Sequence, residues 1–248
     1  MRRVYLAGVL AQCLPAILAA QQSLAQRVTA LPAGTVHLSF AARPDVCGDG
    51  LNNIGNRHEN EEWEADCEEQ PVRVALQLRD HTVVAVRTYV GGRWRSGSPA
   101  RDLGVVRPQD AAAYFLQLAS QPGSLRGDPV LPATLADSIT IWPSLLRLAR
   151  NPQLPEDRRR TAIFWLGQAA GVAATSALDS VVAHDDTSRE LRKQAVFALS
   201  QRPADEGVPA LIRVARTNRD PELRKTALFW LGQSEDPRAL DLFEEILR

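Results

Sequence analysis

One short stretch recurs three times in the C-terminal half of the chain. It reads AIFWLGQ at residues 162–168, AVFALSQ at 195–201 and ALFWLGQ at 227–233, with the copies 33 and 32 residues apart. A period of this length is typical of proteins built from repeated helix pairs. One helix pair cannot bury both of its apolar faces, whereas stacked pairs form a continuous core. The repeat therefore predicts an α-solenoid.

Each copy ends the first helix of a predicted two-helix unit. The second helices read ATSALDSVVAH, EGVPALIRVAR and PRALDLFEEIL. Pro209 and Pro221 are expected where helices start, since the first turn tolerates a missing N–H, and Asp220 is expected to cap a helix. An earlier second helix, WPSLLRLARN at 142–151, indicates a degenerate leading unit whose first helix is 110–119, beginning at a capping Asp110. Residues 121–132 are expected to form a loop.

The preceding region has the two-residue alternation of β-strands. Strands are expected at Thr35–Ala41, Val72–Leu78 and Thr82–Val90, with a shorter one at Gly104–Val106. The short connection Arg79–His81 predicts a β-hairpin between the two longest strands. The chain is therefore expected to have an α+β fold, with a β-rich module at residues 26–107 and the solenoid at 108–248.

The first 25 residues are typical of an export signal. Arg2 and Arg3 precede the mostly apolar segment 4–20, and Ser23-Leu24-Ala25 offers small residues at the two positions that a signal peptidase reads. We expect cleavage after Ala25, hence a periplasmic or secreted protein without a stable membrane span. The alternative is an uncleaved membrane anchor, for which 17 residues interrupted by Gln12 and Pro15 are a poor match.

Export leaves two of the three cysteines, because Cys13 departs with the signal. Cys47 and Cys67 then form an even pair in an oxidising compartment, which predicts a disulfide that ties the β module. Closing a loop of about 20 residues stabilises a fold by roughly 3 kcal/mol on the chain-entropy account. Two free thiols on a metal are the weaker alternative, since no further cysteine completes a zinc site.

The segment between those cysteines is strongly acidic. Residues 45–69 hold nine acids and one base, although the formal net charge of the whole chain is zero. A neutral chain does not favour general nucleic-acid binding. Asp45 and Asp49 match two positions of a calcium loop, but Cys47 stands where an oxygen ligand is needed and Asn56 where a bidentate Glu is needed. A looser calcium site, or an enzyme-accessory role for this loop, is the alternative to a solvated acidic turn.

The last unit resembles HEAT repeats of the short bacterial form called phycobilisome-lyase-like. The matching residues are Asp220, Leu223, Arg224, Ala227, Leu231 and Gly232. The resemblance implies an armadillo-type right-handed superhelix in which the recurring Arg159, Arg192 and Arg224 are structural and pair with acids of a neighbouring unit. The order of Cys47-Gly48-Asp49-Gly50, Cys67, hairpin and repeats is also similar to secreted bacterial HEAT-repeat proteins of unassigned function.

Candidate binding residues lie on the second helices, which line the concave face of the HEAT solenoids that this chain resembles. They are Arg147, Arg150, Arg213 and Arg216, with Trp94 in the Gly-rich loop GGRWRSGS as a further candidate. The alternatives are arginines that complement a helix dipole and a Trp that docks on its own module.

We find no catalytic constellation in the sequence. His58-Glu59 is the only His-Glu pair and lies outside the repeats, and the four histidines are scattered. The sequence therefore favours a non-catalytic scaffold, without a cofactor, that binds a protein partner along its helical surface. Phe229, Trp230 and their copies are expected to seal one unit against the next, so the repeated residues themselves are assigned to stacking.

Overall fold

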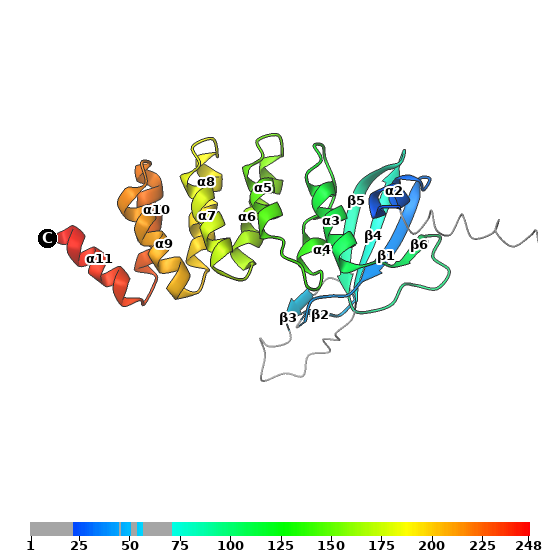
Figure 1. Ribbon diagram of the computed structural model, residues 1–248, viewed down its shortest axis with the longest axis horizontal. Coiled ribbons are helices and arrows are strands. Elements are labelled where there is room, and N and C mark those ends of the chain that lie inside the picture. Colours follow the sequence, from blue (N-terminus) through cyan, green and yellow to red (C-terminus); the bar gives the residue numbers. More distant parts are fainter. Residues whose placement is uncertain (1–21, 45, 51–53, 57–70) are drawn as a thin grey trace, which may run out of the picture.

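The computed structural model describes residues 22–44, 46–50, 54–56 and 71–248. The fold is α+β, as predicted: a small sheet lies at one end, and a row of helices runs from it to the C-terminus (Figure 1). Among these residues, no helix is both long enough and apolar enough to cross a membrane.

The sheet confirms the predicted strands and hairpin. Its four strands, in spatial order, are β5 (Thr82–Val90), β4 (Val72–Arg79), β1 (Gly34–Phe40) and β6 (Arg101–Val105). β4 pairs antiparallel with both β5 and β1, whereas β6 runs parallel to β1. Alternate residues of β4 and β1 are fully buried, which is the arrangement that the two-residue alternation predicts.

The hairpin turn is tied to a short helix that precedes the sheet. Asp80 and His81 both have positive φ, 49° and 60°, as a two-residue type I′ turn requires. His81 Nδ1 lies 2.9 Å from the carbonyl oxygen of Thr29, the last residue of α2 (Leu24–Thr29). Leu24 and Val28 are buried in the core of the sheet. The predicted cleavage after Ala25 falls inside this helix.

Two further strands were not predicted. β2 (Val46–Gly48) and β3 (Ile54–Asn56) pair antiparallel in the acidic segment and form a separate ribbon. The ribbon meets the end of β5, where the Gly50 N–H donates to Val90 O at 2.8 Å. Gly91 has φ 79°, and a Cβ there would lie 2.3 Å from Gly48 O, so this contact needs glycine. Strands of three residues leave no periodic signal in the sequence.

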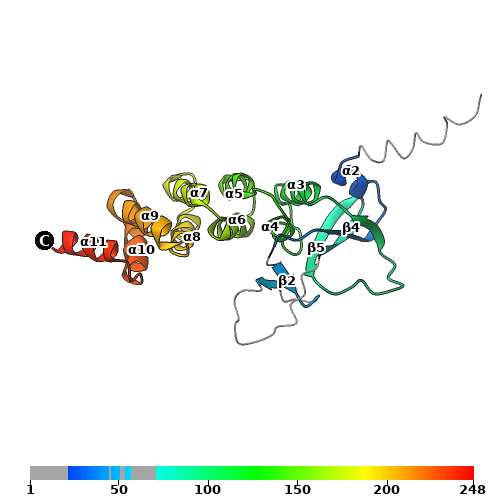
Figure 2. The same cartoon turned by 60° about the horizontal axis from the view of Figure 1, so that its bottom comes forward.

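α3 (Pro108–Ala119) differs from the prediction in two ways. Asp110 does not cap it: the helix begins two residues earlier, and Asp110 accepts hydrogen bonds from Arg107. The buried face of α3, including Phe115, packs in the core of the sheet. The helix also lies in one row with α5 and α7 rather than in the row of first helices (Figure 2). It is therefore not the first helix of the leading unit.

That place is taken by a short helix that begins at the end of the predicted loop. α4 (Leu131–Thr134) precedes α5 (Trp142–Arg150) and lies in the row of first helices (Figure 2). Upstream of α4, Arg126 forms backbone hydrogen bonds with Val84 and Val86 on the free edge of β5. The segment between α3 and α4 thus covers part of β5, an edge strand whose backbone N–H and C=O groups would otherwise lack partners.

The remaining helices form the predicted solenoid in two rows. The first helices are α6 (Glu156–Gln168), α8 (Arg189–Ser200) and α10 (Pro221–Gly232), and the second helices are α7 (Val172–Ala183), α9 (Ala204–Thr217) and α11 (Pro237–Leu247). Neighbours within each row pack together, and one apolar core runs from α3 to α11. Stacking of this kind is the nearest-neighbour architecture that the repeat predicts.

The two prolines expected at helix starts behave differently. Pro221 opens α10, and Asp220 caps that helix by accepting from the Glu222 N–H at 3.0 Å. Pro209 lies inside α9, which begins five residues earlier at Ala204. The second helix read from the sequence starts at Glu206, two residues after the observed start, so the sequence misjudged chiefly the place of Pro209 within the helix.

Candidate functional site

The four candidate arginines on the second helices all have partners within the chain. Arg213 Nη2 lies 3.1 Å from Asp179 Oδ2 on α7, and Arg216 pairs with Glu245 on α11. Arg150 Nη2 lies 3.1 Å from His184 Nδ1 at the end of α7. Arg147 donates to Ser144 within its own helix. Three of the four therefore link neighbouring units, which is a structural task that the sequence did not reveal.

The recurring arginines of the first helices bind carbonyl groups rather than acids. Arg159 Nε donates to Ala149 O at 2.9 Å, and Arg192 Nε donates to Val182 O at 2.8 Å. Arg224 Nη1 donates to Asn218 O at 2.8 Å. Each carbonyl lies at the end of the preceding second helix, where main-chain oxygens lack helical partners. The expected pairing with acids of a neighbouring unit is wrong for Arg159 and Arg224; Arg192 also approaches Asp185 at 3.7 Å.

Trp94 docks on its own module. Its ring stacks on His37 with a centroid distance of 3.7 Å and an interplanar angle of 9°, and Tyr89 meets it edge-on. Burial lowers the pKa of His37 below its ordinary value, which favours the neutral ring in this stack. The Trp94 side chain is half-buried. Its position agrees with the alternative given for it, a loop Trp that packs within the chain.

The acidic loop is described only in part. Asp45 and Cys67 lie outside the described residues, and Asp49 is exposed beside the fully buried Cys47. The disulfide between Cys47 and Cys67 therefore stays a prediction. Within the described ranges, no group of three or more His, Cys, Asp or Glu side chains is placed to hold a metal ion.

Two of the three repeated phenylalanines are exposed, contrary to the expectation that they seal the units, whereas Phe197 packs against the next unit as expected. Phe164 is 46 % exposed and Phe229 is 58 % exposed, while Phe197 is half-buried. The tryptophans behave differently, because Trp230 packs on Phe197 of the preceding unit with a centroid distance of 5.0 Å. Stacking thus explains Trp230, Phe197 and the aliphatic positions, but it leaves exposed phenyl rings on α6 and α10.

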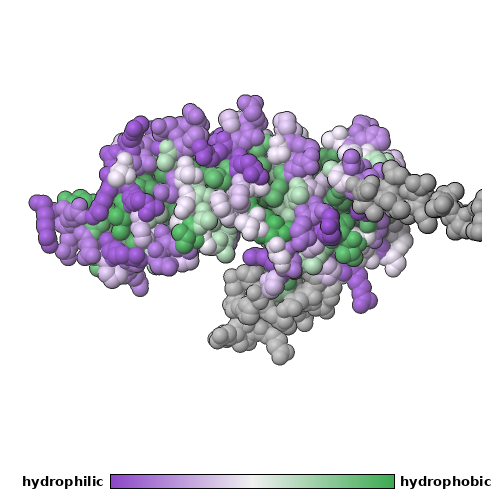
Figure 3. All heavy atoms as spheres, in the orientation of Figure 1, coloured by the Kyte–Doolittle hydropathy of each residue, from purple (hydrophilic) through white to green (hydrophobic). Residues whose placement is uncertain are grey.

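Each exposed ring stands between two polar residues on the same helix face. Positions i, i+4 and i+8 of each first helix hold a basic residue, a phenylalanine and a glutamine, and residues with this spacing share one face. These nine residues form the first-helix ladder: Arg160, Phe164 and Gln168 on α6; Lys193, Phe197 and Gln201 on α8; Lys225, Phe229 and Gln233 on α10. In the view of Figure 3, apolar atoms lie along the middle of the helical part between more polar margins.

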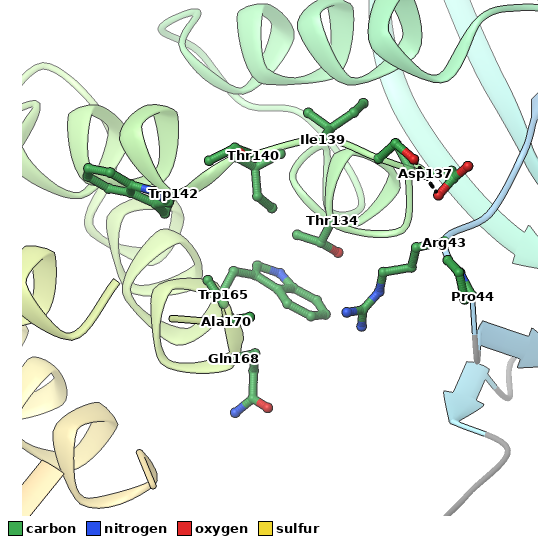
Figure 4. Close-up of a pocket in the computed structure, with 14 residues that line it drawn as sticks. Arg43, Pro44, Thr134, Asp137, Ile139, Thr140, Trp142, Trp165, Gln168 and Ala170 are labelled. Atoms are coloured by element: carbon green, nitrogen blue, oxygen red, sulfur yellow. Dashed lines mark hydrogen bonds between the residues drawn. The ribbon is translucent and has the colours of Figure 1, made fainter. Parts of the chain in front are cut away.

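A hollow that borders the ladder at Gln168 lies where the sheet module meets the solenoid. This junction pocket has a volume of about 480 Å³. Figure 4 shows Arg43 reaching into it toward the ring of Trp165, with Thr134 and Gln168 on either side and Trp142 beyond them. The Trp165 ring is oriented by its Nε1, which lies 3.4 Å from Asp128 Oδ2.

Comparison with known proteins identifies the repeat. Residues 180–248 match the family of HEAT repeats. The match covers α8 to α11 and the last turn of α7. The chain matches no curated protein and no solved structure. The HEAT assignment therefore rests on this match together with the two-row stacking of α4 to α11.

Sequence reasoning missed both the ladder and the junction pocket. The ladder could have been found, because a basic residue, a phenylalanine and a glutamine stand at the same offsets in all three repeat units. The pocket had no such signal. Its walls come from residues 43–44, 134–142 and 165–170, which only the packing of α4 beside α6 brings together.

Proposed function

We propose that this chain is an exported, non-catalytic scaffold of short bacterial HEAT units that binds a protein partner through its first-helix ladder. HEAT repeats commonly mediate protein–protein interactions. The N-terminal sequence supports export to the periplasm or beyond, and the absence of a catalytic motif in the sequence supports a binding role.

The observation that carries the proposal is the exposure of Phe164 and Phe229 at matching positions of α6 and α10, with the half-buried Phe197 at the same position of α8 between them. Scattered apolar side chains on a surface need no explanation, but exposed rings at the same position of two repeat units form a pattern. Aromatic side chains are also enriched among the residues that dominate binding energy. Each ring is flanked by a cation that attracts an acidic group and by an amide that can pair with a peptide backbone.

The packing of the helices sets the length of the bound segment. Helices in contact lie about 8–10 Å apart, so the three rungs span roughly 16–20 Å. An extended chain rises about 3.3 Å per residue, so roughly six residues reach from Phe164 to Phe229. The partner segment should therefore combine apolar and acidic side chains in a stretch of this length.

The second helices are the weaker binding surface. Arg213 and Arg216 already pair with Asp179 and Glu245, and the ladder cations Arg160 and Lys193 likewise pair with Glu156 and Glu190. The two surfaces therefore differ in their aromatic side chains, because the exposed phenyl rings among the described residues, Phe164 and Phe229, lie on first helices. Exchanging one exposed ion pair for another yields little net free energy, since such pairs contribute about 0–1 kcal/mol each.

Position-specific photo-crosslinking tests the proposal. A photoreactive phenylalanine analogue replaces Phe164 or Phe229 in the native host, and adducts are identified by mass spectrometry. We expect one discrete adduct from both positions, lost when Phe197 is changed to Ser. The matched control places the analogue at Val105, which is 81 % exposed on the sheet edge and lies outside the ladder.

Two results would contradict this version of the scaffold. The same adduct from Val105 would show non-specific apolar contact. An adduct from position 213 alone would move the interface to the second helices. Export is tested separately by fusing residues 1–45 to a reporter enzyme that is active only outside the cytoplasm, and an inactive fusion would reject it.

The calcium-binding or enzyme-accessory role of the Cys47–Cys67 loop is tested by melting. A scaffold without a resident cofactor should melt at the same temperature in calcium and in chelator. A rise in Tm with calcium that Asp49→Asn abolishes would support the alternative.

A further inference from the structure

We infer that the junction pocket binds a carboxylate carried on an apolar or aromatic body, with Arg43 as the residue that recognises the charge. This site is separate from the first-helix ladder in what it recognises, although Gln168 borders both. The inference rests on three observations: the guanidinium of Arg43 has no partner among the described residues, the pocket walls are mostly apolar, and the pocket volume suits a small ligand.

Arg43 is an exposed cation on a fixed backbone. Its main-chain N–H donates to Leu135 O at 2.8 Å, and the preceding residue, Ala42, forms a β-bridge with Ala136. Among the described residues, no carboxylate, carbonyl or aromatic ring pairs with its guanidinium, whereas Arg158, Arg202 and Arg216 all do have such partners. The side chain points into the pocket (Figure 4). A guanidinium presents a planar fork of donors that fits a carboxylate with two parallel hydrogen bonds.

One carboxylate already lies near Arg43 and is directed elsewhere. Asp137 lines the pocket wall, where its Oδ1 accepts from Ser138 Oγ at 3.0 Å. No ion pair joins Asp137 to Arg43, and Figure 4 shows the guanidinium and this carboxylate on opposite sides of the Arg43 stem. In the part of the chain that the structure describes, Arg43 and Asp137 are the two charged side chains that line the pocket.

The remaining walls suit an apolar body. Trp165 and Trp142 are half-buried, and Ile139, Ile141 and Ala169 add aliphatic surface. Trp142 Nε1 has no hydrogen-bond partner among the described residues, so it can donate to a bound ligand. The volume of about 480 Å³ falls within the roughly 300–1,000 Å³ of small-molecule sites and accommodates one or two amino-acid residues.

Two sources offer this chemistry: the C-terminal residue of a peptide and a free aromatic acid. The first probe is N-acetylphenylalanine, and its neutral partner is N-acetylphenylalanine amide, with binding followed by tryptophan fluorescence and calorimetry on the full chain. We expect saturable binding of the acid only. Arg43→Gln should weaken it at least tenfold, since a hydrogen-bonded charge contributes about 1.5–3 kcal/mol.

The matched control is Arg93→Gln, which removes the same charge from the exposed loop after β5 and should leave binding unchanged. A tetrapeptide that ends in a free phenylalanine then separates the two sources. Tighter binding than N-acetylphenylalanine indicates a chain end, and equal binding indicates a free acid; both retain the carboxylate site. Equal binding of acid and amide, an unaffected Arg43→Gln variant of unchanged Tm, or no saturable binding of the acid below about 10 mM would each overturn the inference.

Discussion

Single arginines hold the turns of this solenoid together. Arg202 is buried and donates to Gly167 O and Gly171 O at 3.1 Å, to Ala169 O, to Thr175 Oγ1 at 2.8 Å and to Glu206 Oε2 at 2.7 Å. Arg158 likewise donates to the carbonyl of Ala119 at the end of α3 and to the carbonyl of Gly123 in the loop that follows. Helix ends that are buried need such donors, because their last carbonyls have no partner within the helix.

Arg202→Ala should therefore destabilise the protein by roughly 3 kcal/mol or more, since it leaves buried and partly buried carbonyls without a donor and removes the ion-pair partner of Glu206, which keeps only the hydrogen bond from Thr175. Unfolding in urea, followed by circular dichroism, measures the loss. Arg219→Ala is the matched control: Arg219 is exposed, its ion pair with Asp185 spans 3.9 Å, and its removal should cost less than about 0.5 kcal/mol. If Arg202→Ala lowered the free energy of unfolding by less than about 1 kcal/mol, water would be replacing the hydrogen bonds of Arg202.

The cap of α11 predicts a pH dependence. Hydrogen bonds from the Arg238 side chain lower the pKa of Asp236 from its ordinary 3.8 to about 2. Below pH 4 the unfolded chain therefore binds this proton before the folded chain does. The stabilisation is complete above about pH 4 and is lost as the pH falls toward 2.

Asp236→Asn should accordingly have a lower Tm than the wild type at pH 6, and the difference should shrink as the pH falls from about 4 to about 2.5. Scanning calorimetry across this range measures it. Asp241→Asn, which changes an exposed carboxylate on the same helix, should follow the wild-type curve. A constant difference at every pH would mean that Asp236 acts through packing rather than through its charge.

At the scale of elements, two helical glycines allow the effect of close helix packing to be measured apart from the effect of helix propensity. A Cβ on Gly207, in the first turn of α9, would lie 2.4 Å from Leu199 O, so the close approach of α8 and α9 needs glycine. On Gly232, at the end of α10, the nearest foreign atom would be Phe243 Cζ at 3.8 Å.

Gly207→Ala should therefore cost about 2 kcal/mol or more despite the higher helix propensity of alanine. Gly232→Ala should be neutral or stabilising by up to about 1 kcal/mol. Chemical denaturation of the two variants checks both values. If Gly207→Ala were as stable as the wild type, α8 and α9 would not pack as closely as they do here.

α2 gives a second prediction at this scale. Ser23 and Gln26 form a reciprocal capping box, and Leu24 is buried against the sheet. A chain that starts at residue 26 should be roughly 3 kcal/mol less stable than one that starts at residue 22, because it lacks a cap and a buried leucine. Thermal melting of the two chains compares them, and identical Tm values would show that α2 does not support the sheet.

The elements that were predictable share one property, a long regular pattern. The hairpin of β4 and β5 and the helices α5 to α11 each repeat a two-residue or helical period, and the structure contains them all. β2, β3 and α4 have three or four residues each, too few for any period to show. Periodicity also does not report which row a helix joins, so α3 was placed with the first helices although Phe115 packs on the sheet.

The candidate site was predictable to a lesser degree, for a physical reason. A cation such as Arg213 looks the same in sequence whether it meets a partner or Asp179, because the pairing depends on the stacking of α7 and α9. A repeated aromatic is equally ambiguous until its exposure is known. Trp230 packs on Phe197, whereas its neighbour Phe229 projects outward.

At the scale of the whole molecule, the solenoid should lose protection toward its C-terminal end. Stability in such a stack is a sum of nearest-neighbour contacts. α8 packs against α6, α7, α9 and α10, whereas α11 packs chiefly against α9. On α11 only Ala239 and Leu242 are buried, and Leu247 is 85 % exposed.

Hydrogen exchange read by mass spectrometry should therefore show α11 exchanging first and α8 last, because an element with few buried contacts opens at a small fraction of the global unfolding free energy. α7, which has the same row position as α11 but neighbours on both sides, is the internal control and should exchange close to α8. Adding a bound partner along the first-helix ladder should slow exchange in α10 more than in α11. Equal protection from α5 to α11 would instead mean that the stack opens as one cooperative unit.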